Sequence, residues 1–464
     1  MEMMKVINPA TNEVVGEVPA YNGEELELMV DKAYKAQPAW EAVPLYERAD
    51  ILYRFCDIVR AHKEELGVVM AKEMGKPHMD GEIECMGATE IGMQHIEKAK
   101  HLYGEVYPDA MTDAEADLVF TRHEALGVVA AIIPFNFPIE MTIQKTVPAL
   151  VMGNTVIVKA PTTNPIAVKM MVEYAHEAGV PEDAIQFVSG DRKVCTEHVL
   201  KNGKIAALAL TGSTAAGSDM YRYAADSIKK IFLELGGNDA FIIREDADID
   251  TAVEESIWGR VLNMGQICCA AKRFIVHSSI KDEYVEKLKK ALDGLNRGSA
   301  LEDDVMITCL VSEKAAQKVE SQIKQTVEAG AKVVYGGTRN GAAIEPTILV
   351  DVTRDMDVAK DMEIFGPVFP VITFDTDEEA IAIANGSSYG LSGGILSANI
   401  MKALEMASKM ESSGVVVNGS GGYRHNEQPF GGYKSSGIGN EGVSTTVEEY
   451  CRIKTYVLKG AFPK

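Results

Sequence analysis

Seven cysteines among 464 residues are few, and they are scattered at positions 56, 85, 195, 268, 269, 309 and 451. An odd, unpatterned set of this kind argues against a disulfide framework and favours free thiols in a reducing compartment. The chain also lacks any uninterrupted run of about 18 apolar residues, as a membrane-spanning helix requires. Its N-terminus has no basic segment followed by an apolar run, as a signal peptide would have. We therefore expect a cytoplasmic protein with no membrane partner.

Positive charge is also scarce. Lysine and arginine together number 46 against 68 aspartates and glutamates, which leaves a formal net charge of -22. This balance argues against nucleic acid as a partner, but one local cation is enough to hold a small anionic ligand inside a pocket. The length predicts two or three domains, and the 46% hydrophobic content is that of a globular protein.

The segment "GQICCAAKRF" at 265–274 places two of the cysteines side by side. No metal is expected there, because zinc ligands are spaced as in CxxC or HxxxH and the nine histidines form no such cluster. A disulfide between adjacent residues would strain the backbone. A nucleophilic Cys268 needs surroundings that lower the pKa of its thiol. The residues alone leave this interpretation beside that of two small packing residues.

Secondary structure changes character near Leu126. Residues 1–105 are predicted to be mostly helical, from apolar positions three and four apart. Short apolar runs such as "GVVAAII", "NTVIVKA" and "IAALAL" then alternate with helical segments, and the alternation resumes after Asn238. This pattern predicts an α/β fold with parallel sheets covered on both faces. Two alternating segments, near 117–126 and 451–460, are expected to form an exposed sheet covered by another subunit.

A glycine motif near the C-terminus invites a dinucleotide interpretation. "GIGNEG" at 437–442 matches GxGxxG through Gly437, Gly439 and Gly442. The fingerprint requires a strand directly before its first glycine, whereas turn residues precede this one. We interpret the segment as a structural loop.

Six motifs in order resemble the aldehyde dehydrogenase superfamily. "GQICCAAKR" resembles its nucleophile segment, and the others are "PFNFP" at 134–138, "LELGG" at 233–237, "EIFGPV" at 363–368, "NGSSYGLSGGI" at 385–395 and "PFGGYKSSGIG" at 429–439. The resemblance extends from about residue 6 to 458. It is nearest to the semialdehyde, lactaldehyde and non-phosphorylating glyceraldehyde-phosphate branches.

The resemblance implies a fold of three parts. These are a Rossmann-like cofactor domain from residues 1–105 and 126–235, an α/β catalytic domain from 236–440, and a small oligomerisation β-sheet from 106–125 and 441–464. It also implies a homodimer or a homotetramer.

The resemblance further implies NAD(P)-dependent oxidation of an aldehyde to a carboxylic acid. Cys268 would attack the aldehyde carbon, with Cys269 as an inert neighbour. The Asn136 amide would stabilise the oxyanion of the thiohemiacetal, and Glu234 would activate the water that hydrolyses the thioester. Lys145 matches a further lysine of the family. Two alternatives remain open: a CoA-acylating relative, and a binding protein that kept the fold without the chemistry.

Cofactor residues follow from the same resemblance, namely Lys159, Gly212, Ser213, Gly217, Glu363 and Phe365. Thr162 stands three residues after Lys159, where NAD-preferring members commonly carry a glutamate that repels a 2′-phosphate. A hydroxyl donates to phosphate and carries no opposing charge. We therefore predict that NADP is preferred and that NAD is the alternative.

Candidate substrate residues are fewer. Arg424 and His425 lie in a loop that borders the substrate tunnel in the resembling family, and Arg122 is a weaker candidate. Gln144 replaces a frequent aromatic residue, which makes the tunnel more polar. The sequence thus predicts a small polar aldehyde, with a carboxylate or a phosphate as its attractive second group.

Overall fold

The strands predicted between Leu126 and Leu235 lie side by side in one sheet. In the computed structural model, which describes residues 2–108 and 117–462, this six-stranded sheet has the order β19-β9-β8-β5-β6-β7. The pairings from β9 to β7 are parallel, and β19 is antiparallel to β9. The bounds are β5 Val128–Ile132, β6 Thr155–Lys159, β7 Ile185–Val188, β8 Ile205–Thr211, β9 Lys230–Glu234 and β19 Gly437–Ile438. The prediction of five parallel strands here is confirmed.

Alternate residues of this sheet face opposite layers of helices, because successive side chains of a strand point to opposite faces. Val129 and Ala131 of β5 pack in one apolar cluster, and Val128 and Ala130 pack in another. The helices of the first layer are α2 Leu45–Ala61, α3 Lys63–Met74, α4 His78–Lys100, α5 Pro138–Val151 and α6 Ile166–Ala178. Those of the second are α1 Gly23–Ala42, α7 Arg192–Cys195 with the π-turn Thr196–Leu200, and α8 Thr214–Ala225.

The N-terminal segment departs in part from the predicted helical character. Helices α1 to α4 are present, but β1 Glu2–Ile7 and β2 Val14–Ala20 form an antiparallel hairpin before them. Only Val6 and Val18 of this hairpin are buried apolar residues. Because most residues of these two strands are exposed or half-buried, their sequence shows no clear alternation of apolar and polar residues. Contacts with the rest of the protein stabilise the hairpin.

The second sheet has seven strands in the order β12-β15-β16-β11-β10-β17-β18, parallel except for the edge strand β12. Its strands are β10 Asp239–Ile243, β11 Ala271–His277, β12 Lys332–Tyr335, β15 Thr347–Val352, β16 Val368–Phe374, β17 Gly393–Leu396 and β18 Val416–Val417. Its helices are α9 Ile249–Val261, α10 Lys281–Asp293, α11 Glu313–Glu328, α12 Asp377–Asn385 and α13 Ile400–Ala407, with 3-10 turns at Leu262–Gly265 and Asp357–Ala359. A small ribbon pairs β13 Arg339–Asn340 with β14 Ala343–Ile344. The alternation predicted after Asn238 is present, but β15, α11, α12 and α13 were not located from the sequence.

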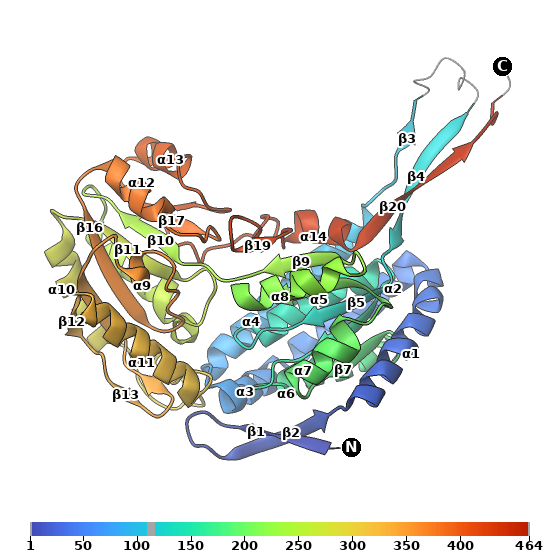
Figure 1. The fold of residues 1–464 in the computed structure, drawn as a ribbon, viewed down its shortest axis with the longest axis horizontal. Coiled ribbons are helices and arrows are strands. Elements are labelled where there is room, and N and C mark those ends of the chain that lie inside the picture. Colours follow the sequence, from blue (N-terminus) through green and yellow to red (C-terminus); the bar gives the residue numbers. More distant parts are fainter. Residues whose placement is uncertain (1, 109–116, 463–464) are drawn as a thin grey trace.

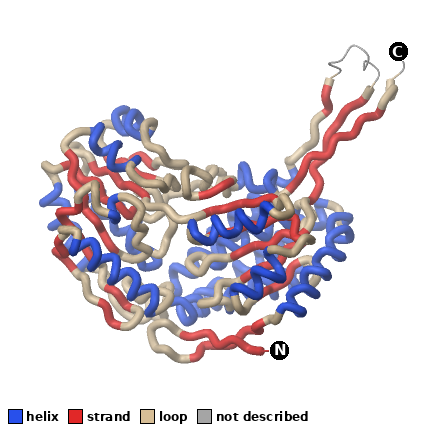
Figure 2. The backbone as a smooth tube through the Cα atoms, in the orientation of Figure 1, coloured by secondary structure: helices blue, strands red, loops and turns tan. Residues whose placement is uncertain are grey.

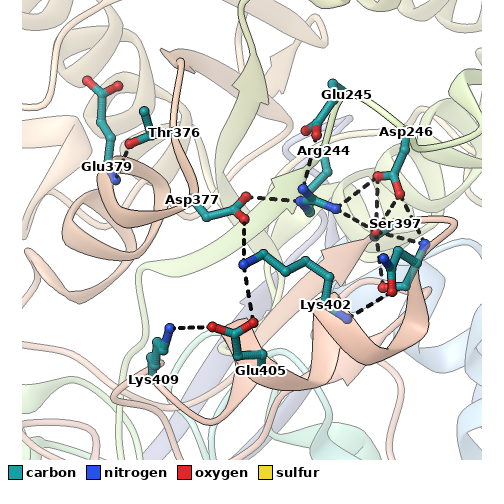
Figure 3. A network of polar contacts seen from close by, with 11 residues as sticks. Arg244, Glu245, Asp246, Thr376, Asp377, Glu379, Ser397, Lys402, Glu405 and Lys409 are labelled. Carbon is teal, nitrogen blue, oxygen red and sulfur yellow. Dashed lines mark hydrogen bonds and ion pairs between the residues drawn. The ribbon is translucent and has the colours of Figure 1, made fainter.

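A polar network ties the carboxyl end of β10 to α12 and α13 (Figure 3). Arg244 donates to Asp377 at 3.0 Å and to Ser397 at 3.1 Å. Asp377 also pairs with Lys402 of α13 at 3.2 Å. Because Arg244 is buried, these partners replace the water that its charge has lost. None of these residues lines the cavity described below. The network joins α12 and α13 to the second sheet.

Three strands form an arm that projects from the body (Figure 1). They are β3 Val106–Tyr107, β4 Leu118–Ala125 and β20 Cys451–Leu458, in the antiparallel order β20-β4-β3. The predicted pairing of residues near 117–126 with those near 451–460 is thereby confirmed. Figure 2 shows helices packed around the strands of the body, whereas the described part of the arm consists of strands and loops. Val106, Ile453 and Val457 of the arm are exposed in the single chain.

The chain returns to the first sheet near its end, where α14 Val443–Glu449 follows β19. The "GIGNEG" segment contains β19 and has no strand directly before it, which agrees with its interpretation as a structural loop. Among the described residues, no helix combines the length and the apolar character needed to cross a membrane.

Candidate active site

A cavity of about 410 Å³ brings together residues that are far apart in the sequence. Asn136, Glu234 and Cys268 all line it. Asn136 follows β5 and Glu234 ends β9, with β8 between them in the sheet. Because the carboxyl ends of parallel strands meet at one edge, both side chains reach the same crevice. Cys268 belongs to the part of the chain built around the second sheet and lies in the loop between α9 and β11.

A strained turn presents Cys268. Asn263, Met264 and Gly265 have φ values of 48°, 56° and 71° in succession, which is the left-handed region. A Cβ at Gly265 would lie 2.6 Å from the carbonyl oxygen of Gly366, so only glycine fits there. Left-handed conformations at the two non-glycine residues cost energy and often mark functional loops.

The Cys268 thiol differs from the other six. All seven cysteines lie in the described part of the chain, and Cys268 alone among them is not buried. The neighbouring Cys269 side chain, together with partial desolvation in the cavity wall, raises the pKa of Cys268 well above its ordinary value. The Lys272 ammonium, which donates to the Cys268 carbonyl, opposes that rise. The thiol is therefore protonated at neutral pH until a base or a ligand changes its surroundings.

Asn136 is fixed against the cysteine loop from both sides. Its side-chain Nδ2 donates to the Gln266 carbonyl at 2.8 Å, and its backbone carbonyl accepts from Asn263 Nδ2 at 2.9 Å. An amide nitrogen carries two N–H bonds, so one remains for a ligand in the cavity. The side chain is buried, which strengthens the hydrogen bond it can donate.

Glu234 is buried, and neither carboxylate oxygen has a hydrogen-bond partner among the described residues. Burial, followed by the proximity of Cys268, raises the pKa of Glu234 well above that of an ordinary carboxyl group. The group thus holds a proton at a pH where a surface glutamate is ionised. Perturbed carboxyl groups of this kind are typical of proton-transfer sites.

Lys145 pairs with Glu441, whose importance the sequence analysis missed. Lys145 Nζ lies 2.6 Å from Glu441 Oε1, and Glu441 lines the main cavity with Glu234. Burial would raise the pKa of Glu441, but Lys145 and Arg424 hold it below its ordinary value. Glu441 belongs to the "GIGNEG" segment, which the sequence analysis interpreted from its glycines alone. A lone acidic residue among turn residues carried no signal of its own.

The predicted pyrophosphate residues lie at the same edge of the first sheet. Gly212 follows β8 and donates its N–H to the Glu234 carbonyl at 3.0 Å. Ser213 caps α8 by accepting from the Ala216 N–H at 3.3 Å. Gly217 is buried, and a Cβ there would lie 2.7 Å from the Leu235 side chain. The helix is thus packed closely on the sheet with its N-terminus free to bind an anion.

Lys159 and Thr162 follow the neighbouring strand β6. Lys159 donates to the Ala160 carbonyl at 2.7 Å, and burial lowers its pKa. Thr162 is exposed. The crevice between β5, β6 and β8, where the strand order reverses direction, is the position at which open parallel sheets bind nucleotides. The residues present therefore fit a dinucleotide.

Glu363 and Phe365 extend this surface toward Cys268. Glu363 Oε1 accepts from the Gly237 N–H at 3.2 Å and lies 3.5 Å from Lys272 Nζ. A Cβ at Gly236 would lie 2.5 Å from Glu363 Oε2, so the glycine admits the carboxylate. The Phe365 ring meets Phe135 edge to face at 5.9 Å. Lys272 thus connects the loop of the nucleophile with that of Glu363.

Only one of the three predicted substrate residues lines the cavity of the single chain. The Arg424 guanidinium lies 4.3 Å from the Phe430 ring centroid, and its Nε and Nη2 are buried without a partner among the described residues. His425 is exposed and contacts Tyr423 edge to face at 5.7 Å. Arg122 is exposed on β4, opposite Lys454 of β20. Neither of the last two borders the cavity, and their roles stay predictions.

Four charged residues of the cavity wall were also missed, namely Lys76, Asp80, Glu84 and Glu140. Asp80 and Glu84 stand four residues apart at the start of α4, which places them on one helical face, and Lys76 lies in the link before that helix. That spacing was available in the sequence, but such a face is more often solvated than buried.

Comparison with known proteins identifies the family. The model of the aldehyde dehydrogenase family matches residues 1–456. The chain is 37% identical to a glutarate-semialdehyde dehydrogenase of Pseudomonas aeruginosa, covering 99% of this chain and 95% of the relative. It is 35% identical to an NADP-dependent succinate-semialdehyde dehydrogenase of Escherichia coli, covering 98% of this chain and 94% of that protein.

Solved structures agree with these matches. The glyceraldehyde-3-phosphate dehydrogenase of Methanocaldococcus jannaschii, solved with NADP, superposes with a TM-score of 0.93 at 33% identity, covering 98% of this chain and 99% of that one. The lactaldehyde dehydrogenase of Escherichia coli gives a TM-score of 0.94 at 31% identity, covering 99% and 96%. The chain belongs to the aldehyde dehydrogenase family, with the fold of that family, and is an NAD(P)-dependent aldehyde dehydrogenase.

Proposed function

We propose that this enzyme oxidises a small polar aldehyde bearing a carboxylate or a phosphate to its carboxylic acid, and that it prefers NADP. The observation that carries the proposal is the convergence of Cys268, Asn136, Glu234 and an unpartnered Arg424 on one cavity. Together they supply a nucleophile, an oxyanion donor, a base and an anchor for an anion.

Cys268 begins the reaction. Once deprotonated, its sulfur forms a bond to the aldehyde carbon, and the carbonyl electron pair moves onto the oxygen. The free N–H of Asn136 and the backbone N–H of Cys268 donate to that oxyanion. A donor of this kind typically stabilises the transition state by ~3 kcal/mol. Lys159, Ser213 and Glu363 would hold a dinucleotide, which would supply the acceptor for the hydride that leaves the same carbon.

Glu234 serves the second half of the reaction. The resulting thioester on Cys268 is cleaved by water, whose proton passes to the Glu234 carboxylate as the new C–O bond forms. The tetrahedral adduct collapses, the sulfur leaves, and the acid is released. Because its carboxylate lies in the cavity and has a raised pKa, Glu234 is suited to accept this proton. This base favours hydrolysis over transfer of the acyl group to CoA.

The preference for NADP rests on Thr162. It is exposed just beyond β6, and a hydroxyl there donates to a 2′-phosphate without repelling it. Two of the compared relatives agree with this inference: one is named for NADP and the other was solved with it.

The anionic group of the substrate is assigned to Arg424. Glu441 is paired with Lys145, and burial raises the pKa of nearby Glu140. Both acids attract the guanidinium through space, but its Nε and Nη2 have no hydrogen-bond partner among the described residues. A desolvated arginine with free N–H groups binds carboxylate or phosphate strongly. Glutarate and succinate semialdehydes, the substrates named for two relatives, each carry a carboxylate.

Three further expectations belong to this proposal. The catalytic domain of 236–440 and the cofactor domain of 1–105 and 126–235 would meet at the cavity. A second copy of the chain would cover the oligomerisation segments 106–125 and 441–464, of which 109–116 and 463–464 lie outside the described residues. The exposed apolar side chains of the arm, such as Ile453, suit a homodimer or homotetramer. The seven free thiols suit a reducing, cytoplasmic compartment.

The first prediction concerns the activity itself. Succinate semialdehyde with NADP is expected to produce NADPH, followed by its absorbance, and faster than with NAD. Cys268→Ala should abolish this, and Glu234→Gln should slow turnover roughly 10²- to 10⁴-fold while leaving a burst of one NADPH per site. A steady Glu234→Gln rate equal to that of the wild type would refute the role of the base.

The second prediction concerns the cofactor. Thr162→Glu should lower the ratio of kcat/KM for NADP over NAD at least ~10-fold, because the new carboxylate repels the 2′-phosphate. Thr163→Glu is the matched control, since its site is equally exposed and adjacent. An unchanged ratio in Thr162→Glu, or an equal fall in both variants, would contradict the assignment.

The third prediction concerns the substrate. Arg424→Met should raise the KM for succinate semialdehyde ~10- to 100-fold, because a charge-assisted contact is lost. The KM for neutral butyraldehyde should change little. Arg122→Met is the control, as Arg122 lies outside the cavity. Equal effects of Arg424→Met on both aldehydes would sink the anion anchor.

The fourth prediction concerns the thiol. Iodoacetamide should label Cys268 before the six buried cysteines, as peptide mass spectrometry will show. Since the thiolate reacts and the pKa of Cys268 is raised, the labelling rate should still be climbing at a pH where an ordinary thiol, with a pKa of about 8.5, has levelled off. A rate already constant at pH 7 would contradict the raised pKa.

A further inference from the structure

A buried ion pair in the cavity wall has no part in the mechanism above. Lys76 Nζ donates to Glu84 Oε2, and the two side chains are 1% and 0% exposed. Lys76 follows α3, and Glu84 lies in the second turn of α4. Burying two charges costs several kcal/mol of desolvation each, so such pairs contribute little net stability. A purely structural site of this size would be filled as well by apolar residues.

The second oxygen of Glu84 holds the start of α5. Glu84 Oε1 accepts from the N–H groups of Ile139 at 2.8 Å and Glu140 at 3.0 Å. The N-cap residue Phe137 offers no side-chain hydrogen bond to this helix. A helix N-terminus leaves its first N–H groups without partners and carries partial positive charge. Glu84 thus caps α5 from a neighbouring helix.

Lys76 holds the residue before α5. Its Nζ lies 3.9 Å from the centroid of the Phe137 ring, a cation–π distance. Phe137 is the direct neighbour of Asn136. The ion pair therefore contacts the chain immediately after Asn136, which is itself bonded to Gln266 and Asn263.

We propose that Lys76 and Glu84 form a positioning pair for the oxyanion site and act through Asn136. The inference rests on the role proposed for Asn136. Together the two residues fix Phe137 and the first turn of α5, and this sets the direction of the free Asn136 N–H. An amide displaced by about 1 Å loses much of its effect on a developing charge. The charges of Lys76 and Glu84 in the cavity wall thus serve to fix the position of Phe137 and of the start of α5.

Cofactor-free hydrolysis of 4-nitrophenyl acetate provides the test, since it needs the thiol and the oxyanion site but neither hydride transfer nor a chosen aldehyde. Asn136→Ala should lower kcat ~10²- to 10³-fold. Lys76→Met should lower kcat ~10- to 100-fold with KM changed less than ~3-fold. The double variant should be no slower than Asn136→Ala alone, because both substitutions remove one function. Lys72→Met, an exposed lysine of α3, is the control and should match the wild type.

Phe137→Leu provides a second route that leaves the ion pair intact. It should also lower kcat, with the same lack of additivity toward Asn136→Ala. The proposal is overturned if the losses from Lys76→Met and Asn136→Ala multiply, or if both Lys76→Met and Phe137→Leu melt earlier yet hydrolyse the ester at the wild-type rate. Failure of the aldehyde assay alone would contradict the proposed function, and the ester result would still decide this inference.

Discussion

The parallel arrangement of β5, β6, β8 and β9 is the constraint on which the site depends. Hydrogen bonding in one direction brings their carboxyl ends to a single edge of the sheet. Asn136, Lys159, Ser213 and Glu234 therefore meet without being close in sequence. Most residues of β5, β6 and β8 are buried, and β9 is buried toward its carboxyl end. The strands behind this edge are therefore held between the two helix layers.

A second constraint is the close approach of the other lobe. The loop of Cys268 reaches the sheet edge through three successive residues in the left-handed region. Gly265 has no side chain, which allows the backbone of Gly366 to lie close to it. Asn136 then bonds to that loop through its side-chain Nδ2 and through its backbone carbonyl. Cys268 and Asn136, the proposed nucleophile and oxyanion donor, are thus held by one set of contacts. A loop tied in this way loses little freedom when a substrate binds, which is the condition for preorganised catalysis.

Burial gives these residues their chemical character. Burial raises the pKa of Glu234, and the Cys269 side chain together with desolvation raises that of Cys268. Nε and Nη2 of Arg424 are buried without a partner among the described residues. The same cavity wall contains more carboxylates than cations, yet two of its acids, Asp80 and Glu140, have pKa values raised by burial. A formally acidic protein can therefore offer an anionic ligand one effective positive charge.

The sequence by itself determined the alternation of strands and helices, because this depends on periodicity. It indicated the residues proposed to carry the chemistry and their order, because these depend on residue type. It also indicated that residues near 117–126 and 451–460 pair. It did not reveal the N-terminal hairpin or β15, whose strands owe their conformation to neighbours. Only the tertiary structure decided that Arg424 lines the cavity while Arg122 and His425 do not, and that Glu441 pairs with Lys145. It alone placed Lys76 and Glu84 against the start of α5. Distance and burial set pKa values and partners, and neither can be read along a single chain.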